Sequence, residues 1–334
     1  MNGYDRYIKM LQGEAVDYLP RIPILMQFAA EYIGSNYGAF ASDYGVLTEA
    51  NIRCAEDFGM DQLSAISDPY RETHGFGAEI EFMRDGVPKC LKPPLQDRKD
   101  LNLLAQPNPL QSQRMLDRIE AIRRYKAQHE HQYSIMGWIE GPAAEAADLR
   151  GVATFLVDLL EDRPFCEDLM DRCVEVGIEF AKAQIEAGAD TIGIGDAVAS
   201  QVSPRVYNRL IQPREKRLVD AIQKMGAFVR LHICGNITHL LPGIADLGVD
   251  VLDVDHLVDM ASVRQVVGSS VVLAGNIDPV AGVLKSTPER IHDAIATIYK
   301  IVGNPYMVNA GCEIPAGTPP DNLKALCKPI PYAP

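Results

Sequence analysis

The chain lacks the long apolar runs that a membrane-spanning helix needs. No stretch of its 334 residues approaches the roughly 20 consecutive apolar residues required to cross a bilayer. The stretch from Met1 to Met10 also lacks the apolar segment of a secretory signal. Its 47% hydrophobic and 23% charged residues are typical of a globular protein with a sizeable core. We therefore expect a soluble, cytoplasmic protein that does not enter a membrane.

Basic charge is also scarce, since 32 Lys and Arg residues face 45 Asp and Glu residues and the net charge is −13 at pH 7. Proteins that bind nucleic acid need a basic surface, so the charge argues against a nucleic-acid partner. The seven cysteines are odd in number and have no regular spacing, which argues against a disulfide framework. We expect them to be reduced thiols, some of which can serve a metal ion.

The apolar stretch from Phe228 to Asn236 ends in two soft metal ligands, His232 and Cys234. Residues two apart on a strand point to the same face, and Gly235 then lets the backbone turn away. Cys312 also stands at the end of a short apolar run. Two thiolates and one imidazole, with the fourth position open, suit a tetrahedral zinc ion. We therefore take these three residues as candidate zinc ligands.

A His-x-Cys pair on its own is more often core filler, because free cysteine is among the most buried residue types. A metal site is favoured because the His232–Cys234 pair and Cys312 both stand at strand-to-loop junctions, in a chain whose strands are expected to be parallel. Such junctions gather at one end of a parallel sheet.

Eight apolar segments of strand length alternate with helical segments, including helices expected over 48–58, 111–129 and 204–225. Continuous apolar strands suit a parallel sheet covered by helices, so the pattern predicts a single-domain (β/α)8 TIM barrel over residues 1–334. A helical extension is expected at the N-terminus, and Asp85-Gly86 marks a β-hairpin insertion over about 76–95. The expected strands cover residues 21–28, 61–66, 133–139, 189–196, 228–233, 249–254, 270–274 and 305–309.

Further candidate site residues follow the ends of these strands, where barrel active sites lie. Glu140 is a candidate fourth metal ligand or substrate-orienting group, with hydrogen bonding to loop amides an equally good alternative. Asp196 is a candidate to hold the ring nitrogen of His232 or a substrate hydroxyl. Tyr207 and Asn276 are candidate substrate-binding residues, against the plainer alternatives of a core tyrosine and a loop cap.

Three landmarks resemble the uroporphyrinogen decarboxylase-like superfamily of barrels, in the right order and over nearly the whole chain. They are Gly188-Ala-Asp190, Gly275-Asn-Ile-Asp-Pro279 and Thr318-Pro-Pro-Asp-Asn322. Porphyrin decarboxylases of this superfamily carry an Arg-Gln-Ala-Gly-Arg element where this chain has Met26–Glu31. They also carry Gly-His-Gly near the last strand, where this chain has Gly311-Cys-Glu313. Both departures argue against porphyrin decarboxylation.

The His-x-Cys pair with the late cysteine resembles instead the zinc-dependent, corrinoid-linked methyltransferase branch of this superfamily. That branch includes methylcorrinoid:thiol methyltransferases and the methyltransferase components of O-demethylases. The resemblance implies that His232, Cys234 and Cys312 bind Zn²⁺. The chain lacks an Asp-x-His-x-x-Gly motif, which resembles the motif that corrinoid-binding modules use to supply a lower ligand to cobalt. Cobalamin is therefore expected to arrive on a partner corrinoid protein.

The same resemblance favours transfer of a methyl group from a methyl ether, such as an aryl methyl ether, to cob(I)alamin. The alternative is transfer from a methylcorrinoid to a small thiol similar to coenzyme M. A decarboxylase-like or non-catalytic scaffold barrel also stays open. The sequence does not identify the small-molecule donor or acceptor. Barrel enzymes often self-associate, so the sequence is compatible with a homo-oligomer.

Overall fold

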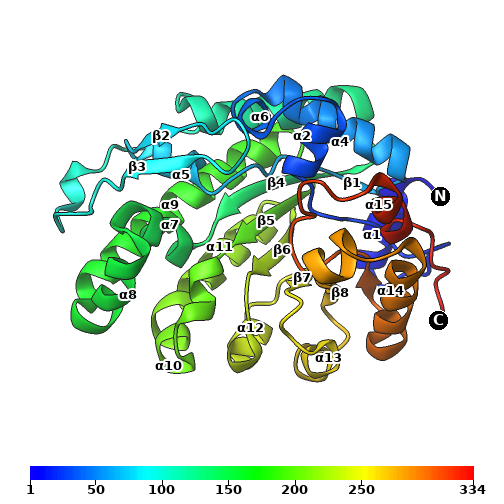
Figure 1. The fold of residues 1–334 in the computed structure, drawn as a ribbon. Coiled ribbons are helices and arrows are strands. Elements are labelled where there is room, and N and C mark those ends of the chain that lie inside the picture. The colour runs from blue at the N-terminus through cyan, green and yellow to red at the C-terminus, as the bar shows by residue number, and fades with distance from the viewer.

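The computed structural model describes residues 1–334 and confirms a barrel-like, curled parallel sheet surrounded by helices (Figure 1). Seven strands pair in the order β1-β4-β5-β6-β7-β8-β9, and every neighbouring pair is parallel. Each of the last seven expected strand segments overlaps one of these strands, and only β4 extends past its segment, by one residue. They are β1 (Gln62–Ser64), β4 (Ser134–Glu140), β5 (Thr191–Gly195), β6 (Phe228–Ile233), β7 (Val251–Val254), β8 (Val272–Ala274) and β9 (Tyr306–Met307).

Residues 20–24 occupy the eighth position of the barrel, between β9 and β1. Arg21 forms a parallel bridge with Val308, and the Ile22 N–H donates to the Val308 carbonyl at 2.9 Å. On the other side the Asp61 N–H donates to the Arg21 carbonyl at 2.8 Å. The segment therefore links the two edges of the seven-stranded sheet.

The expected strand over 21–28 is wrong in its extent, because this segment pairs only at an isolated bridge. Pro20 and Pro23 have no N–H to donate, so a regular ladder cannot continue through them. The chain turns instead into the short helix α2 (Gln27–Tyr32).

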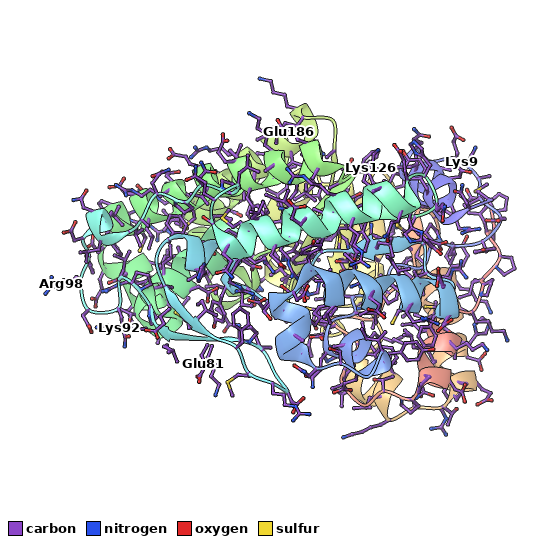
Figure 2. All side chains as sticks on the ribbon, turned by 90° about the horizontal axis from the view of Figure 1, so that it is seen from above. Lys9, Glu81, Lys92, Arg98, Lys126 and Glu186 are labelled. Atoms are coloured by element: carbon purple, nitrogen blue, oxygen red, sulfur yellow. The ribbon has the colours of Figure 1, made fainter.

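Helices pack around the sheet, and the largest core cluster contains 93 buried residues. Figure 2 shows Lys126 on α6 and Glu186 on α9 pointing away from the barrel. No helix has the length and apolar character needed to span a bilayer. The longer helices are α4 (Tyr44–Phe58), α6 (Gln113–His129), α7 (Pro142–Arg150), α8 (Val152–Glu161), α9 (Arg163–Ala187), α11 (Gln212–Lys224) and α14 (Pro288–Val302). The shorter ones are α3 (Tyr37–Ser42), α5 (Tyr70–Gly75), α10 (Pro204–Val206), α12 (Leu241–Ala245), α13 (Met260–Val267) and α15 (Pro320–Leu326).

The helix expected over 204–225 is interrupted. A π-helical turn over Tyr207–Ile211 separates α10 from α11. Pro213 has no N–H to continue an α-helical ladder, which accounts for a break at this point.

The predicted hairpin insertion is confirmed. Strands β2 (Glu79–Glu81) and β3 (Lys89–Lys92) form a separate two-stranded antiparallel sheet between β1 and β4 in the sequence. In Figure 1 this hairpin lies at the side of the molecule opposite the two chain termini.

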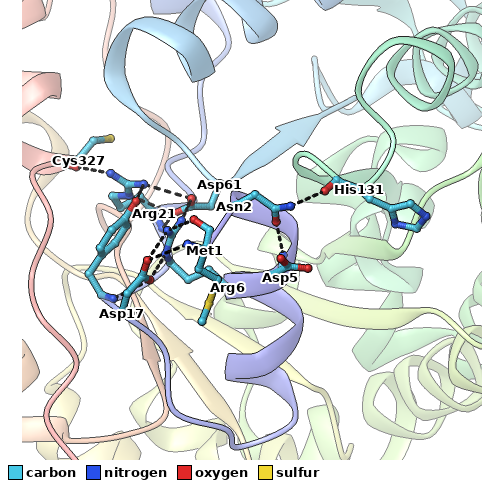
Figure 3. A network of polar contacts seen from close by, with 10 residues as sticks. Met1, Asn2, Asp5, Arg6, Asp17, Arg21, Asp61, His131 and Cys327 are labelled. Atoms are coloured by element: carbon cyan, nitrogen blue, oxygen red, sulfur yellow. Dashed lines mark hydrogen bonds and ion pairs between the residues drawn. The ribbon is translucent and has the colours of Figure 1, made fainter.

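The N-terminal helix α1 (Gly3–Leu11) is tied to the start of β1 by a buried ion-pair network (Figure 3). Asp61 accepts hydrogen bonds from Arg6 and from both the backbone and the guanidinium of Arg21. Arg6 also pairs with Asp17 at 2.7 Å. This network joins the expected helical extension to the amino-terminal end of the barrel.

Candidate metal centre

Three potential metal ligands meet beyond the carboxyl end of β6. His232 Nε2 lies 3.1 Å from Cys234 Sγ, which lies 3.9 Å from Cys312 Sγ. The three ligand atoms all lie within 4.8 Å of one another. Two sulfurs bound to one tetrahedral zinc at about 2.3 Å would be roughly 3.8 Å apart. The triad thus fits zinc in both donor type and spacing, and the structure brings the three candidate ligands together.

Two glycines allow the backbone to bring the triad together. Gly235 has a φ of +94°, in the left-handed region, and it turns the chain away directly after Cys234. At Gly311 an added Cβ would overlap the backbone nitrogen of His256, so only glycine fits the close approach that precedes Cys312. The ligands therefore depend on local backbone geometry as well as on strand direction.

The cysteine pair shares protons unequally. Cys234 donates a hydrogen bond toward Cys312, and this bond together with the neighbouring His232 lowers the pKa of Cys312 to about 4. A thiolate is the form of cysteine that binds metal. The lowered pKa of Cys312 therefore favours the form of cysteine that binds metal.

Asp253, which the sequence analysis missed, stands behind the histidine. Its Oδ2 lies 3.4 Å from His232 Nδ1 and 2.7 Å from Arg230 Nη2, and Asn309 donates to its Oδ1 at 2.8 Å. Burial by itself would raise the pKa of Asp253, but Arg230 and His232 hold it well below its ordinary value. The signal in the sequence was a carboxylate inside an apolar strand, together with an arginine two residues before His232.

A pocket of about 160 Å³ opens beside the triad. Ile24, Ile66 and Trp138 belong to a small apolar cluster that is separate from the main core and contributes part of the pocket wall. The pocket is lined by Ile24, Met26, Ile66, Asp68, Pro69, Trp138, Glu140, Gly195, Ala197, His232, Cys234, Cys312 and Glu313. An apolar wall next to a metal triad can hold a small substrate and exclude water from it.

Trp138 lies against the backbone of β5. A Cβ added at Gly193 would overlap the indole ring, and one added at Gly195 would lie 2.8 Å from its Cζ2 atom. The sequence Gly193-Ile-Gly195 therefore makes room for the single tryptophan of the chain at the pocket wall.

Glu140 lines the pocket, as expected for a residue at the end of β4. It accepts hydrogen bonds from Arg71 Nη2 at 2.8 Å and from Trp138 Nε1 at 3.1 Å. Burial raises the pKa of Glu140 well above its ordinary value, although Arg71 works in the opposite direction. The carboxyl group thus lines the same pocket as the metal triad and is held in place by two side chains.

Asp196 lies outside the pocket and does not contact the imidazole of His232, contrary to that expectation. It is fully buried and accepts hydrogen bonds from the backbone N–H groups of Ala143 and Ala144, at 3.3 and 2.7 Å. These groups belong to the first turn of α7, where free N–H groups favour a carboxylate. Asp253 occupies the place beside the histidine that the sequence analysis gave to Asp196.

Tyr207 and Asn276 also lie outside the pocket lining. Tyr207 is fully buried in the π-helical turn, and its hydroxyl donates to Glu215. The Asn276 amide donates to the carbonyls of Asp255 and Val258 at 3.0 and 2.7 Å, which braces the loop after β7. These contacts match the plainer alternatives of a core tyrosine and a loop cap.

A uroporphyrinogen decarboxylase (URO-D) family model matches residues 2–330 of the chain. The chain belongs to the URO-D family. This confirms the superfamily resemblance drawn from the sequence motifs.

Several relatives match almost the full length of the chain. The chain is 27% identical to the methylcobamide:CoM methyltransferase MtbA of Methanosarcina mazei over 330 residues, which cover 96% of this chain and 95% of that protein. It is 29% identical to the methylcobamide:CoM methyltransferase MtaA of Methanosarcina barkeri, with the same coverage. It is also 27% identical to the uroporphyrinogen decarboxylase of Psychromonas ingrahamii, again over 96% of this chain and 95% of that protein. Identity alone therefore does not separate the two activities within the URO-D family.

Among solved structures, a methyltransferase from Methanosarcina mazei superposes with a TM-score of 0.89 and 26% identity, over 98% of this chain and 97% of that one. A B12-independent methionine synthase from Shewanella has a TM-score of 0.60 at 15% identity, over 92% and 94% of the two chains. The second likeness shows a shared fold alone.

Proposed function

We propose that this protein is a zinc-dependent methyltransferase that exchanges methyl groups with a corrinoid carried by a partner protein. The observation that carries the proposal is the convergence of His232, Cys234 and Cys312 beside a small pocket. The full-length relatives named methylcobamide:CoM methyltransferases support it. Against decarboxylation, Met26 and Cys312 both line this pocket, and both lie in the segments where the sequence departs from porphyrin decarboxylases.

The small-molecule substrate that we propose is a thiol, which accepts the methyl group from the corrinoid. The sequence motifs favour a methyl ether as donor instead. The names of the relatives support the thiol, because the substrate in those names, coenzyme M, is a thiol. We therefore place the thiol acceptor ahead of the ether donor.

In the proposed reaction, zinc held by the triad would bind the substrate sulfur and stabilise it as a thiolate, the nucleophilic form. Asp253 orients His232 so that Nε2 faces the cysteines. Glu140, held by Arg71, lines the pocket beside the triad, where its carboxyl group would contact the substrate, and the thiol proton would leave to solvent. The partner's methylcorrinoid would supply the methyl group: the sulfur–carbon bond would form as the cobalt–carbon bond breaks, and the electron pair would stay on cobalt as cob(I)alamin.

The test is demethylation of free methylcobalamin by 2-mercaptoethanol, followed by absorbance, with the purified, zinc-loaded protein. We expect turnover with the wild-type protein and none with Cys312→Ser. Cys90→Ser is the matched control, because Cys90 lies on the hairpin away from the triad and should leave turnover unchanged. No turnover by the wild-type protein, or equal turnover by Cys312→Ser, would contradict the proposal.

The ether donor is tested in the opposite direction with the same protein. Cob(I)alamin is mixed with an aryl methyl ether, and formation of methylcobalamin is followed by absorbance. Methylcobalamin formed here, without demethylation by thiols, would restore the ether donor.

A further inference from the structure

Acidic side chains dominate the charge of the pocket next to the metal triad. Three of its 13 lining residues carry carboxyl groups, namely Asp68, Glu140 and Glu313, and none is a lysine or an arginine. A small pocket with several carboxylates and apolar walls favours a substrate of opposite charge.

Two of these carboxyl groups are already paired inside the protein. Asp68 accepts two hydrogen bonds from Arg114, at 2.9 and 2.6 Å, and Glu140 accepts one from Arg71 at 2.8 Å. Arg71 also has a second carboxylate nearby, since its Nε lies 3.7 Å from Glu72 Oε2. The charges of Arg71 and Arg114 are therefore opposed by protein carboxylates, and neither arginine lines the pocket.

Glu313 has no cation as a partner. Its Oε1 accepts a hydrogen bond from the backbone N–H of Gln27 at 3.0 Å, and its Oε2 receives none from the chain. Burial raises the pKa of Glu313 to about 7, so the carboxyl group is only partly ionised near neutral pH. The metal would not offset the charge of the ionised form, because a divalent ion bound by two thiolates and a neutral imidazole is neutral overall. Glu313 thus faces the pocket with a free oxygen next to the ligand Cys312.

An aromatic ring adds a second attraction for cations. Trp138 lines the same pocket, and its indole N–H donates to Glu140. Cations are drawn to the faces of aromatic rings, most strongly to tryptophan. The pocket therefore combines a metal triad for sulfur with carboxylates and an indole for a positive group.

We propose that the substrate thiol carries an ammonium group, with its sulfur at the triad and its ammonium beside Glu313 and Glu140. This inference rests on the proposed function and narrows its substrate to small aminothiols, of which cysteamine is the simplest. The sulfonate of coenzyme M would instead place a negative charge beside Glu313. The transfer itself is unchanged: sulfur gains the methyl group, cobalt keeps the electron pair, the thiol proton leaves, and the ammonium group takes no part.

The test is calorimetric binding to the zinc-loaded protein of three thiols that share a two-carbon chain. They are cysteamine with an ammonium group, 2-mercaptoethanol with a hydroxyl group and 2-mercaptoethanesulfonate with a sulfonate group. We expect cysteamine to bind tightest and the sulfonate weakest, with at least about tenfold between them, because a hydrogen bond to a charged group contributes that much.

Glu313→Gln separates the charge effect from differences in thiol acidity. Glutamine keeps an oxygen that can accept the bond from Gln27. We expect the preference for cysteamine over 2-mercaptoethanol to fall by about tenfold while 2-mercaptoethanol binds as before. Glu140→Gln is a second variant for use if Glu313→Gln loses zinc. Glu186→Gln, on the exposed face of α9, is the control and should match the wild-type protein.

The outcomes separate the two proposals. If the sulfonate binds tightest, or if neither glutamine variant changes the preference, the ammonium inference fails while the proposed function stands, provided that 2-mercaptoethanol binds. If no thiol binds to the zinc-loaded protein, the proposed function fails and the inference fails with it.

Discussion

The Nδ1 atom of His232 lies 3.4 Å from Oδ2 of Asp253, on the side of the imidazole away from the cysteines. Arg230 and Asn309 hold the carboxylate in this position. Metal-binding histidines usually direct their second ring nitrogen to such a carboxylate, which fixes the tautomer and strengthens the ligand. The barrel interior below the triad therefore contributes to the proposed metal site.

Asp253→Asn should weaken zinc binding by about tenfold, the lower end of the range for such orienting residues, because asparagine keeps the shape but loses the charge. Zinc affinity is measured by competition with a chelator. Asp61→Asn is the matched control, since Asp61 is a buried, arginine-paired carboxylate at the opposite end of the barrel. Both variants should unfold at lower temperature, but only Asp253→Asn should bind zinc more weakly. Equal zinc affinity in both would contradict the role of Asp253.

Gly193→Ala should displace the indole of Trp138, because the added Cβ would overlap the ring. Overpacking of this kind costs about 1–3 kcal/mol of unfolding free energy. The emission spectrum should also change, since Trp138 is the only tryptophan. In Gly282→Ala, the control, the new Cβ would meet its nearest neighbour at an ordinary 3.6 Å. Unchanged emission and stability in Gly193→Ala would show that the ring does not depend on this glycine.

Asp148→Asn should stabilise the protein more at pH 8 than at pH 5. Burial, followed by the neighbouring carboxylates Glu72 and Asp68, raises the pKa of Asp148 to about 8. The folded state therefore binds this proton more tightly than the unfolded state, and stability falls as the pH rises from about 4 to about 8. Asparagine removes that loss, which for a pKa of about 8 is about 3–4 kcal/mol larger at pH 8 than at pH 5. Denaturant unfolding at both pH values measures the difference, with the exposed Asp246→Asn as control. A pH-independent effect of Asp148→Asn would show that this carboxyl group does not titrate as described.

The sequence was most informative where one physical pattern dominated. Continuous apolar runs located the strands from β4 to β8, because a parallel sheet covered by helices needs no polar face. The segment over 21–28 has the same apolar character, which led to the prediction of a full strand. Pro20 and Pro23 limit its backbone hydrogen bonding, so that prediction was too long. The three proposed ligands could be identified because histidine and cysteine are rare, and because the His232–Cys234 pair and Cys312 each stand where an expected strand ends.

Contacts that depend on strand register could not be read from the chain. Asp253 pairs in register with His232 across β6 and β7, and nothing in the linear sequence gives that alignment. Asp196 does end a strand, as expected, but its carboxylate turns toward the first turn of α7. Position at a strand end therefore identified candidates without showing which way each side chain points.

The most direct test of the zinc-thiol account is X-ray absorption at the zinc edge, on the purified protein before and after a small thiol is added. Without thiol, the account predicts two sulfur ligands at about 2.3 Å and at least one nitrogen at about 2.0–2.1 Å. With thiol, it predicts a third sulfur at the same distance. A protein that holds no zinc, or a zinc ion whose sulfur count does not change when thiol is added, would contradict it.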